Sequence, residues 1–211
     1  DVTNGVTLTI RITAGVVVGS VSNLLPSIDF GDDEDWPEDF EIMLEIYGLV
    51  AGKGGDACGN YNKAAGTIYP PVNFPPKPGG TALLTRFPIK VRVKPGGKMG
   101  GGGGAGGPAA VSGGLTGVGS IPGAGAGRDP GAAAIVGGNP GTDLEGGSQV
   151  PVSGQLNSGK GGDIGEPGQD GGNYAGSAQT TTGAVAGNAI DGVSFCTILE
   201  GDADILGPRV N

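Results

Sequence analysis

Aromatic side chains are the residues of this sequence best suited to binding, because they make up only 5% of it and several stand in polar surroundings. Three fall in the proline-rich stretch NYNKAAGTIYPPVNFPPKP (60–78), and a fourth interrupts a glycine-rich stretch at NYAGSAQ (173–179). Exposed aromatic residues on loops held by a rigid frame are typical of recognition surfaces. The binding candidates are Tyr61, Tyr69, Phe74, Asn173, Tyr174 and Gln179.

These aromatic residues also have a structural interpretation. Tyr69 and Phe74, with the prolines around them, could pin their loop to a core, and Tyr174 could pack inside a glycine lattice. The sequence leaves both roles open.

The sequence contains no set of residues that matches a known catalytic arrangement. The sequence contains no histidine, which removes His-based triads and His-ligated zinc. The stretch GQLNSGKG (154–161) comes near the phosphate-binding pattern GxxxxGK[ST], but Gly161 replaces the hydroxyl that binds Mg²⁺, and no strand or helix is predicted around it. We therefore expect neither an enzyme nor a bound cofactor.

Carboxylates gather in the stretch IDFGDDEDWPEDFE (28–41). Oxygen-rich sets of this kind can coordinate Ca²⁺, and the candidate ligands are Asp32, Asp33 and Asp35. Their spacing matches no cation-binding loop. The pattern favours a solvated acidic loop that caps a trimer or a sheet edge, without a metal.

Net charge and hydropathy exclude two classes of partner. The formal net charge of -9 opposes the phosphate backbone, so no nucleic acid is expected as a partner. No apolar run approaches the roughly 20 residues that span a bilayer, so membrane insertion is not expected either. The first residue, Asp1, follows neither Met nor a basic leader, which indicates a fragment of a longer protein or a processed chain.

The two cysteines stand in different settings. Cys58 lies in a glycine-rich loop, and Cys196 lies within an apolar alternating run. One pair cannot define a disulfide framework. The sequence favours a buried small residue at Cys196 and an incidental thiol at Cys58, and a disulfide between them is the alternative.

Alternating apolar residues predict strands at both ends of the chain. In VTLTIRI (6–12) the valine, the leucine and the isoleucines share one face. In RFPIKVRV (86–93) the apolar residues also share a face, and Pro88 restricts the segment to a sheet edge or a strand start. Further strands are predicted at 16–18, 41–52, 192–200 and 202–210. No segment keeps a helical period.

Most of the 48 glycines lie between Gly96 and Gly187, in runs such as KMGGGGGAGG (98–107). Collagen would need glycine at every third position, and the stretch 113–141 breaks that phase. Silk-like and calcium-binding repeats are absent as well. What remains is a bundle of polyglycine-II helices, in which missing side chains let neighbouring backbones approach and bond to one another.

The expected fold is mainly β with a polyglycine-II-type module and almost no helix. We divide it into a strand-rich N-terminal part (1–94), a glycine-rich module (95–188) and C-terminal strands (189–211) that return to the N-terminal part. The reason is that the strands at both ends have one apolar face, and packing these faces together makes one core.

Four pieces of the chain, VTLTIRITAGVVVGS, IYGLVAGKGGDACG, GGKMGGGGGAGG and GDADILGP, resemble the glycine-rich C-terminal region of phage tail-tip host-specificity proteins, the J-like central tail fibre proteins. The glycine-rich stretch is also similar to the polyglycine-II sandwich of T-even-type distal fibre adhesins. The resemblance implies a receptor-binding domain at the tail tip of a virion, active at the host-cell surface during attachment.

The same resemblance implies the partners. They are a host surface receptor (an outer-membrane protein, a polysaccharide or a pilus), other tail-tip proteins, and two further copies of the chain in a homotrimer. The alternative function is a structural fibre segment or a glycine-rich spacer that recognises no receptor.

Overall fold

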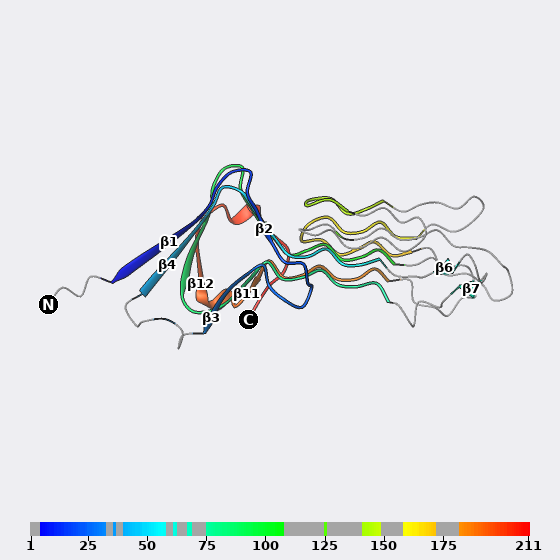
Figure 1. Cartoon of the computed structure of the whole chain (residues 1–211), viewed down its shortest axis with the longest axis horizontal. Coiled ribbons are helices and arrows are strands. Elements are labelled where there is room, and N and C mark those ends of the chain that lie inside the picture. Colours follow the sequence, from blue (N-terminus) through cyan, green and yellow to red (C-terminus); the bar gives the residue numbers. More distant parts are fainter. Residues whose placement is uncertain are drawn as a thin grey trace.

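The computed structural model describes residues 5–32, 36, 40–57, 61–62, 67–68, 75–107, 125, 141–148, 158–171 and 182–211. Figure 1 shows a triangular body of strands beside a stack of long glycine-rich segments that extends away from one of its corners. We call the triangular body, formed by all strands except β6 and β7, the prism. We call the stack of glycine-rich segments the glycine module.

Four successive coils of the chain build the described part of the prism, and each coil contributes one strand to each of three sides. Coil 1 contains β1 (Val6–Ile12), β2 (Val17–Gly19) and β3 (Ile28–Asp32). Coil 2 contains β4 (Phe40–Ile46), β5 (Leu49–Ala51) and β8 (Leu83–Arg86). Coil 3 contains β9 (Ile89–Val93), β10 (Lys98–Gly100) and β11 (Ile190–Asp191). Coil 4 contains β12 (Cys196–Glu200), β13 (Ile205–Leu206) and β14 (Arg209–Val210).

The three sides are parallel sheets in which the coils follow one another in order. Sheet A is β1-β4-β9-β12, sheet B is β2-β5-β10-β13 and sheet C is β3-β8-β11-β14. Every pairing among them is parallel. The fold is therefore a three-sided parallel β-helix, and the C-terminal strands extend the sheets that the N-terminal strands begin.

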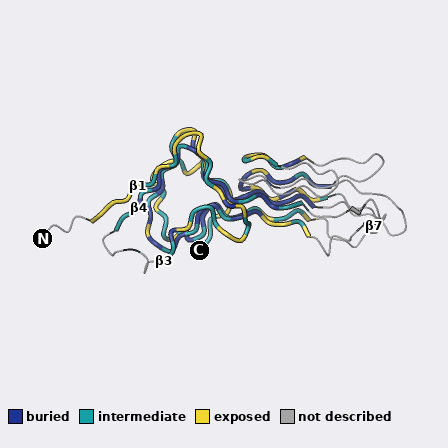
Figure 2. Tube along the Cα trace, in the orientation of Figure 1, coloured by how far each residue is buried: buried dark blue, intermediate teal, exposed yellow. Residues whose placement is uncertain are grey.

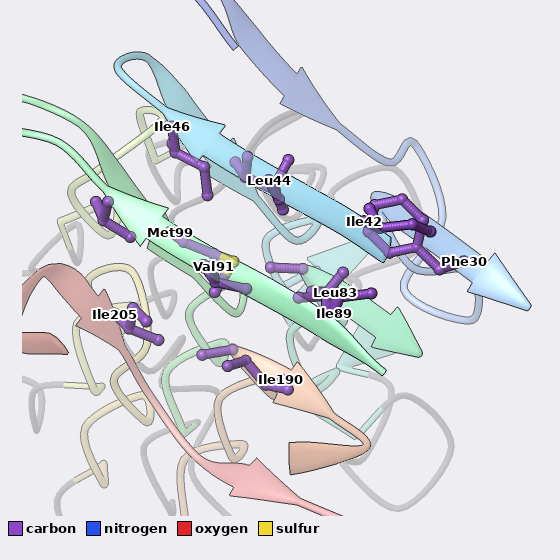
Figure 3. Close-up of a cluster of buried hydrophobic side chains, with 14 of the residues drawn as sticks. Phe30, Ile42, Leu44, Ile46, Leu83, Ile89, Val91, Met99, Ile190 and Ile205 are labelled. Atoms are coloured by element: carbon purple, nitrogen blue, oxygen red, sulfur yellow. The ribbon is translucent and has the colours of Figure 1, made fainter. Parts of the chain in front are cut away.

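Side chains stacked coil upon coil fill the interior of the prism (Figure 3). In sheet A, Ile42, Leu44 and Ile46 pair with Ile89, Val91 and Val93, and all six are buried. Sheets B and C add Val50, Met99, Ile205, Leu83 and Ile190 to the same core. Because the side chains of a strand alternate between its two faces, one register places every second residue inside.

Two of the predicted strands turn a corner of the prism. The segment 41–52, predicted as one strand, is β4 and β5 separated at Tyr47 and Gly48. A side chain at Gly48 would overlap the carbonyl oxygens of Val16 and Thr13, so only glycine fits this corner. The segment 86–93 likewise divides, because β8 ends at Arg86 and β9 begins after Pro88. Pro88 thus precedes a strand start, but β9 lies inside sheet A and not at its edge.

The corners of coil 4 contain the helical turns found in the described part of the chain. They are two single 3₁₀ turns, Val193–Phe195 and Asp202–Asp204, which take the place of the first residues of the predicted strands 192–200 and 202–210. Each follows a glycine with a left-handed backbone, Gly192 (φ 102°) or Gly201 (φ 75°). The expectation of a mainly β chain with almost no helix is confirmed. Over the described ranges, no helix is long and apolar enough to cross a membrane.

The outer face of sheet A carries charges that pair between coils. The Glu45 carboxylate lies 2.8 Å from Arg11 of coil 1 and 3.7 Å from Arg92 of coil 3. The hydrogen bond and ion pair with Glu45 raise the pKa of Arg11. Lys90 pairs with Glu41 at 2.6 Å on the same face. Opposite charges on adjacent strands favour the observed register over a shift that would bring like charges together.

Candidate binding surfaces

Segment 100–107 runs through the middle of the glycine module and is buried at every residue (Figure 2). Its amides bond to neighbouring segments at intervals of three residues. The amides of Gly102 and Ala105 donate to the carbonyl oxygens of Gly80 and Lys77, at 2.9 and 3.1 Å. Three residues is the repeat of the polyglycine-II helix, so the structure predicted for the glycine-rich stretch is confirmed at its centre.

The same interval recurs toward the other neighbours of this segment. The carbonyl oxygens of residues 101, 104 and 107 accept from the antiparallel segment 159–165, at 2.7, 2.8 and 2.8 Å. Those of residues 100 and 103 accept from segment 52–55, at 3.0 and 2.9 Å, and those of residues 102 and 105 accept from segment 184–187, both at 2.8 Å. Backbone hydrogen bonds therefore hold the module together where a domain would ordinarily have an apolar core.

Two members of the module come from the part of the sequence expected to be strand-rich. Segment 52–57 follows β5, and segment 75–80 leads back to β8. Both bond to the central segment, at Gly52, Gly80 and their neighbours. The chain thus leaves the prism for the module after β5 and again after β10, always at the same corner (Figure 1).

The structure places one of the predicted binding residues. Tyr61 belongs to β6 (Tyr61–Asn62), which pairs antiparallel with β7 (Thr67–Ile68) at the end of the module farthest from the prism (Figure 1). The remaining predicted binding residues lie outside the described residues: Tyr69, Phe74, Asn173, Tyr174 and Gln179. Their role stays a prediction.

The acidic stretch 28–41 is organised around Trp36. Its ring stacks on Phe40 with centroids 5.2 Å apart, and its Nε1 donates to the carbonyl oxygen of Phe30 at 2.6 Å. Of the candidate metal ligands, Asp32 lies at the end of β3, whereas Asp33 and Asp35 fall outside the described residues. Within the ranges that the structure describes, no three His, Cys, Asp or Glu side chains gather as metal ligands would.

Charged side chains in the module pair locally. Lys160, the lysine of the near match to a phosphate-binding loop, lies 2.9 Å from Asp163. The Gly146 amide also donates to Asp163 at 2.9 Å, and this hydrogen bond is the main cause of the lowered pKa of Asp163. A lowered carboxyl pKa means that the contact stabilises the fold above the ordinary pKa of an aspartate and is lost as the pH falls through the lowered value. Asp163 therefore ties segment 141–148 to segment 158–171 at neutral pH.

Cys196 carries a free, half-buried thiol at the start of β12. It packs against the core and pairs with Ile89, and burial raises its pKa to about 11. Cys196 is thus partly buried, where the sequence favoured a fully buried residue, and because its thiol is free the alternative disulfide with Cys58 is wrong. Cys58 itself lies outside the described residues.

Within the described residues, the coil 1 end of the prism is uncovered. Val6 and Leu8 pair with Phe40 and Ile42 of β4, so they continue the inward face of sheet A, and none of the described strands pairs with the other edge of β1. Both are exposed, whereas the sequence predicts that this face is buried. The prediction that this face is buried is wrong for Val6 and Leu8, because a side chain in the interior of the prism is buried only where a further coil covers it.

Exposed apolar side chains concentrate on the same coil. Among the described residues nine large hydrophobic side chains are exposed, and six of them belong to coil 1: Val6, Leu8, Val16, Val21, Leu24 and Leu25. Leu24 is 87% exposed and Val21 is 78% exposed. Coil 4, at the opposite end, contributes Leu199 alone to this set. The sequence analysis did not predict that Leu24 and Leu25 are exposed. The pattern that could have indicated it is a pair of adjacent leucines inside the turn-like stretch SNLLPS (22–27).

The described chain is thus a three-sided β-helix with a polyglycine-II module that projects from one of its corners. The family model described as phage tail fibre adhesin Gp38 matches residues 1–210, and the chain belongs to this family. No curated protein matches the chain.

One solved structure shares the fold. It is the crystal structure of the gp37-gp38 adhesin tip complex of the bacteriophage S16 long tail fibre, with a TM-score of 0.64 and 22% sequence identity. The match covers 98% of this chain and 72% of that chain.

The family assignment makes the chain a phage tail fibre adhesin, which attaches the virion to its host and is not an enzyme. It supports the adhesin over the alternative of a spacer without receptor recognition. It also corrects the resemblance, because the match is to the fibre adhesins and not to the J-like central tail fibre proteins.

Proposed function

We propose that the two ends of the molecule divide the work of attachment: the far loops of the glycine module contact the host receptor, and the open coil 1 end sits on the tail fibre. One contrast carries the proposal. The described segments of the module are held by backbone hydrogen bonds, whereas coil 1 carries most of the exposed large apolar side chains of the described residues.

The module suits receptor recognition because its scaffold makes little use of side chains. Loops at its far end can change sequence without disturbing hydrogen bonds between backbones. The residues proposed to contact the receptor, whether an outer-membrane protein, a polysaccharide or a pilus, are the six of the sequence analysis: Tyr61, Tyr69, Phe74, Asn173, Tyr174 and Gln179.

Exchange of loops tests the receptor side. Residues 58–74 and 172–181 are replaced by the corresponding loops of a family member from a phage with another host, which leaves the described scaffold outside β6 and β7 intact. Adsorption of the purified chain is expected to follow the source of the loops. An exchange of residues 20–27 serves as the control and should leave adsorption of the purified chain unchanged. Adsorption that stays with the original host after the loop exchange contradicts the proposal.

The open end suits a fibre as partner. Among the described strands, β1, β2 and β3 each pair on one side only, so three strand edges and the apolar interior face the same way. In the phage S16 structure the protein of this fold is in complex with gp37. A fibre whose end presents three strands could extend all three sheets and cover Val6 and Leu8.

The double change Leu24→Asp and Leu25→Asp is expected to weaken binding to the distal fibre protein of the same phage by at least about thirtyfold, because exposed apolar anchors dominate such interfaces. Binding is measured by sedimentation of the mixed proteins. The control is Leu199→Asp, which replaces an exposed leucine at the coil 4 end, though a less exposed one (45%), and should bind as the unchanged chain does. Equal affinity of all three proteins would exclude coil 1 as the fibre contact.

The homotrimer predicted from the resemblance is a different way to cover the same end. Three copies of the chain would then bury coil 1 against one another. The mass of the purified chain alone, from light scattering, separates the two arrangements, since a monomer that binds the fibre supports the proposal and a stable trimer opposes it.

A further inference from the structure

Ile164 stands out in the glycine module because the stretch SGKGGDIGEPGQDG (158–171) contains no other large hydrophobic residue. Its side chain is 6% exposed and lies outside the main core of the prism. It forms a second apolar cluster with Ala51, Leu49 and Leu206. The cluster joins the glycine module to the prism.

The outer face of sheet B forms the socket for this side chain. Val50, Met99 and Ile205 point into the prism core, so the alternate residues of β5, β10 and β13 point outward. At the centre of that outer face stands Gly100, and the Ile164 Cγ1 lies 2.7 Å from the place where a Cβ on Gly100 would be. The missing side chain of Gly100 therefore makes the hole that Ile164 fills.

The backbone around Ile164 is tied on two sides. Its amide donates to the carbonyl oxygen of Leu144 at 3.0 Å, and the next amide, of Gly165, donates to Gly101 at 2.7 Å. Gly165 has a left-handed backbone (φ 76°) that turns the chain around at this point. One turn thus connects the segment 141–148 to the central segment of the module.

Segments 141–148 and 158–171 do not continue along the chain into a strand of the prism. Both turn back beside it, whereas segments 52–57, 75–80, 100–107 and 182–188 each continue into a strand (Figure 1). A segment that only turns back is held in place by its contacts. The Ile164 side chain is the apolar contact that these two segments make with sheet B.

We infer that Ile164 is a positioning residue: seated in the hole over Gly100, it locks segments 141–148 and 158–171 of the glycine module to sheet B. The lock fixes the direction in which the module points. That Ile164 holds these segments to sheet B does not depend on the proposed receptor contact. Only the advantage of a fixed module for attachment rests on the proposed function.

Hydrogen–deuterium exchange of the full chain tests the lock. In Ile164→Ala the amides of segments 141–148 and 158–171 are expected to exchange at least about tenfold faster, while those of β4 and β9 keep their rates. Ile164→Val, which refills most of the hole, is expected to restore slow exchange.

Ile89→Ala is the matched control, since it removes the same atoms from a buried isoleucine of the prism core. It is expected to speed exchange in the prism strands. The inference is overturned if Ile164→Ala leaves exchange in 141–148 and 158–171 unchanged, or raises it uniformly across prism and module as a general loss of stability would. Host adsorption is measured separately, so failure of the receptor proposal leaves the exchange result standing.

Discussion

Gly102→Ala is expected to disrupt the glycine module and to lower the free energy of unfolding by about 3 kcal/mol or more, the upper end for overpacking. The added Cβ would overlap the carbonyl group of Lys53. That group cannot move freely, because its oxygen accepts from the Gly80 amide at 2.7 Å. Gly102 is itself fixed, since its amide donates to Gly80 and its carbonyl accepts from Gly187. One methyl group therefore breaks bonds to several segments. Chemical denaturation measures the loss.

Gly96→Ala is the control for this prediction. Gly96 has a left-handed backbone (φ 87°) but nothing within 4 Å of an added Cβ. Its replacement is expected to cost about 1 kcal/mol, the strain of the backbone alone. Equal losses in the two variants would mean that close approach between backbones does not limit the module.

Leu44→Ala is expected to lower the free energy of unfolding of the prism by about 2 to 5 kcal/mol. Leu44 is fully buried in β4, with Ile10 on one neighbouring strand and Val91 on the other. The coils above and below are held in register by sheet hydrogen bonds, so the side chains around the vacated space can relax only in part. The loss is measured by denaturant titration and by the melting temperature.

Met43→Ala is the matched control in the same strand. Met43 neighbours Leu44 but points to the outer face of sheet A, where it is half-buried. We expect a loss below about 1 kcal/mol there, as for other surface positions. If Leu44→Ala were no more harmful than Met43→Ala, the interior of the prism would not be the main source of its stability.

The sequence predicted the type of structure well and its connections poorly. Period-two alternation located β1, β4 and β9, because half-buried strands carry that pattern whatever they pair with. The alternation could not show that segment 41–52 turns at Gly48. A corner of a β-helix disturbs the alternation as little as a β-bulge within one strand does, so the pattern does not tell the two apart. Pairings such as β9 with β12 join residues about a hundred positions apart, and no local pattern encodes them.

The two proposed binding surfaces differ in how clearly the sequence marks them, for a related reason. Loops rich in tyrosine and proline stand out in the sequence, and Tyr61 lies in β6 at the far end of the module (Figure 1), but its role in binding stays a prediction. The open end of coil 1 was missed because Val6 and Leu8 have the same pattern as buried strand residues. Whether such a face is covered depends on the number of coils, which the pattern of a single strand does not contain.

The sequence by itself determined a mainly β chain with almost no helix and the polyglycine-II contacts seen in the described part of the glycine-rich stretch, since both follow from the steric properties of the residues. Tertiary structure alone decided which glycines are irreplaceable, because that depends on the backbone that faces each one, as Lys53 faces Gly102. It also decided that Ile164 seats over Gly100 and that coil 1 lies open. These features arise where distant segments meet, and the distances between backbones there are set by the whole fold.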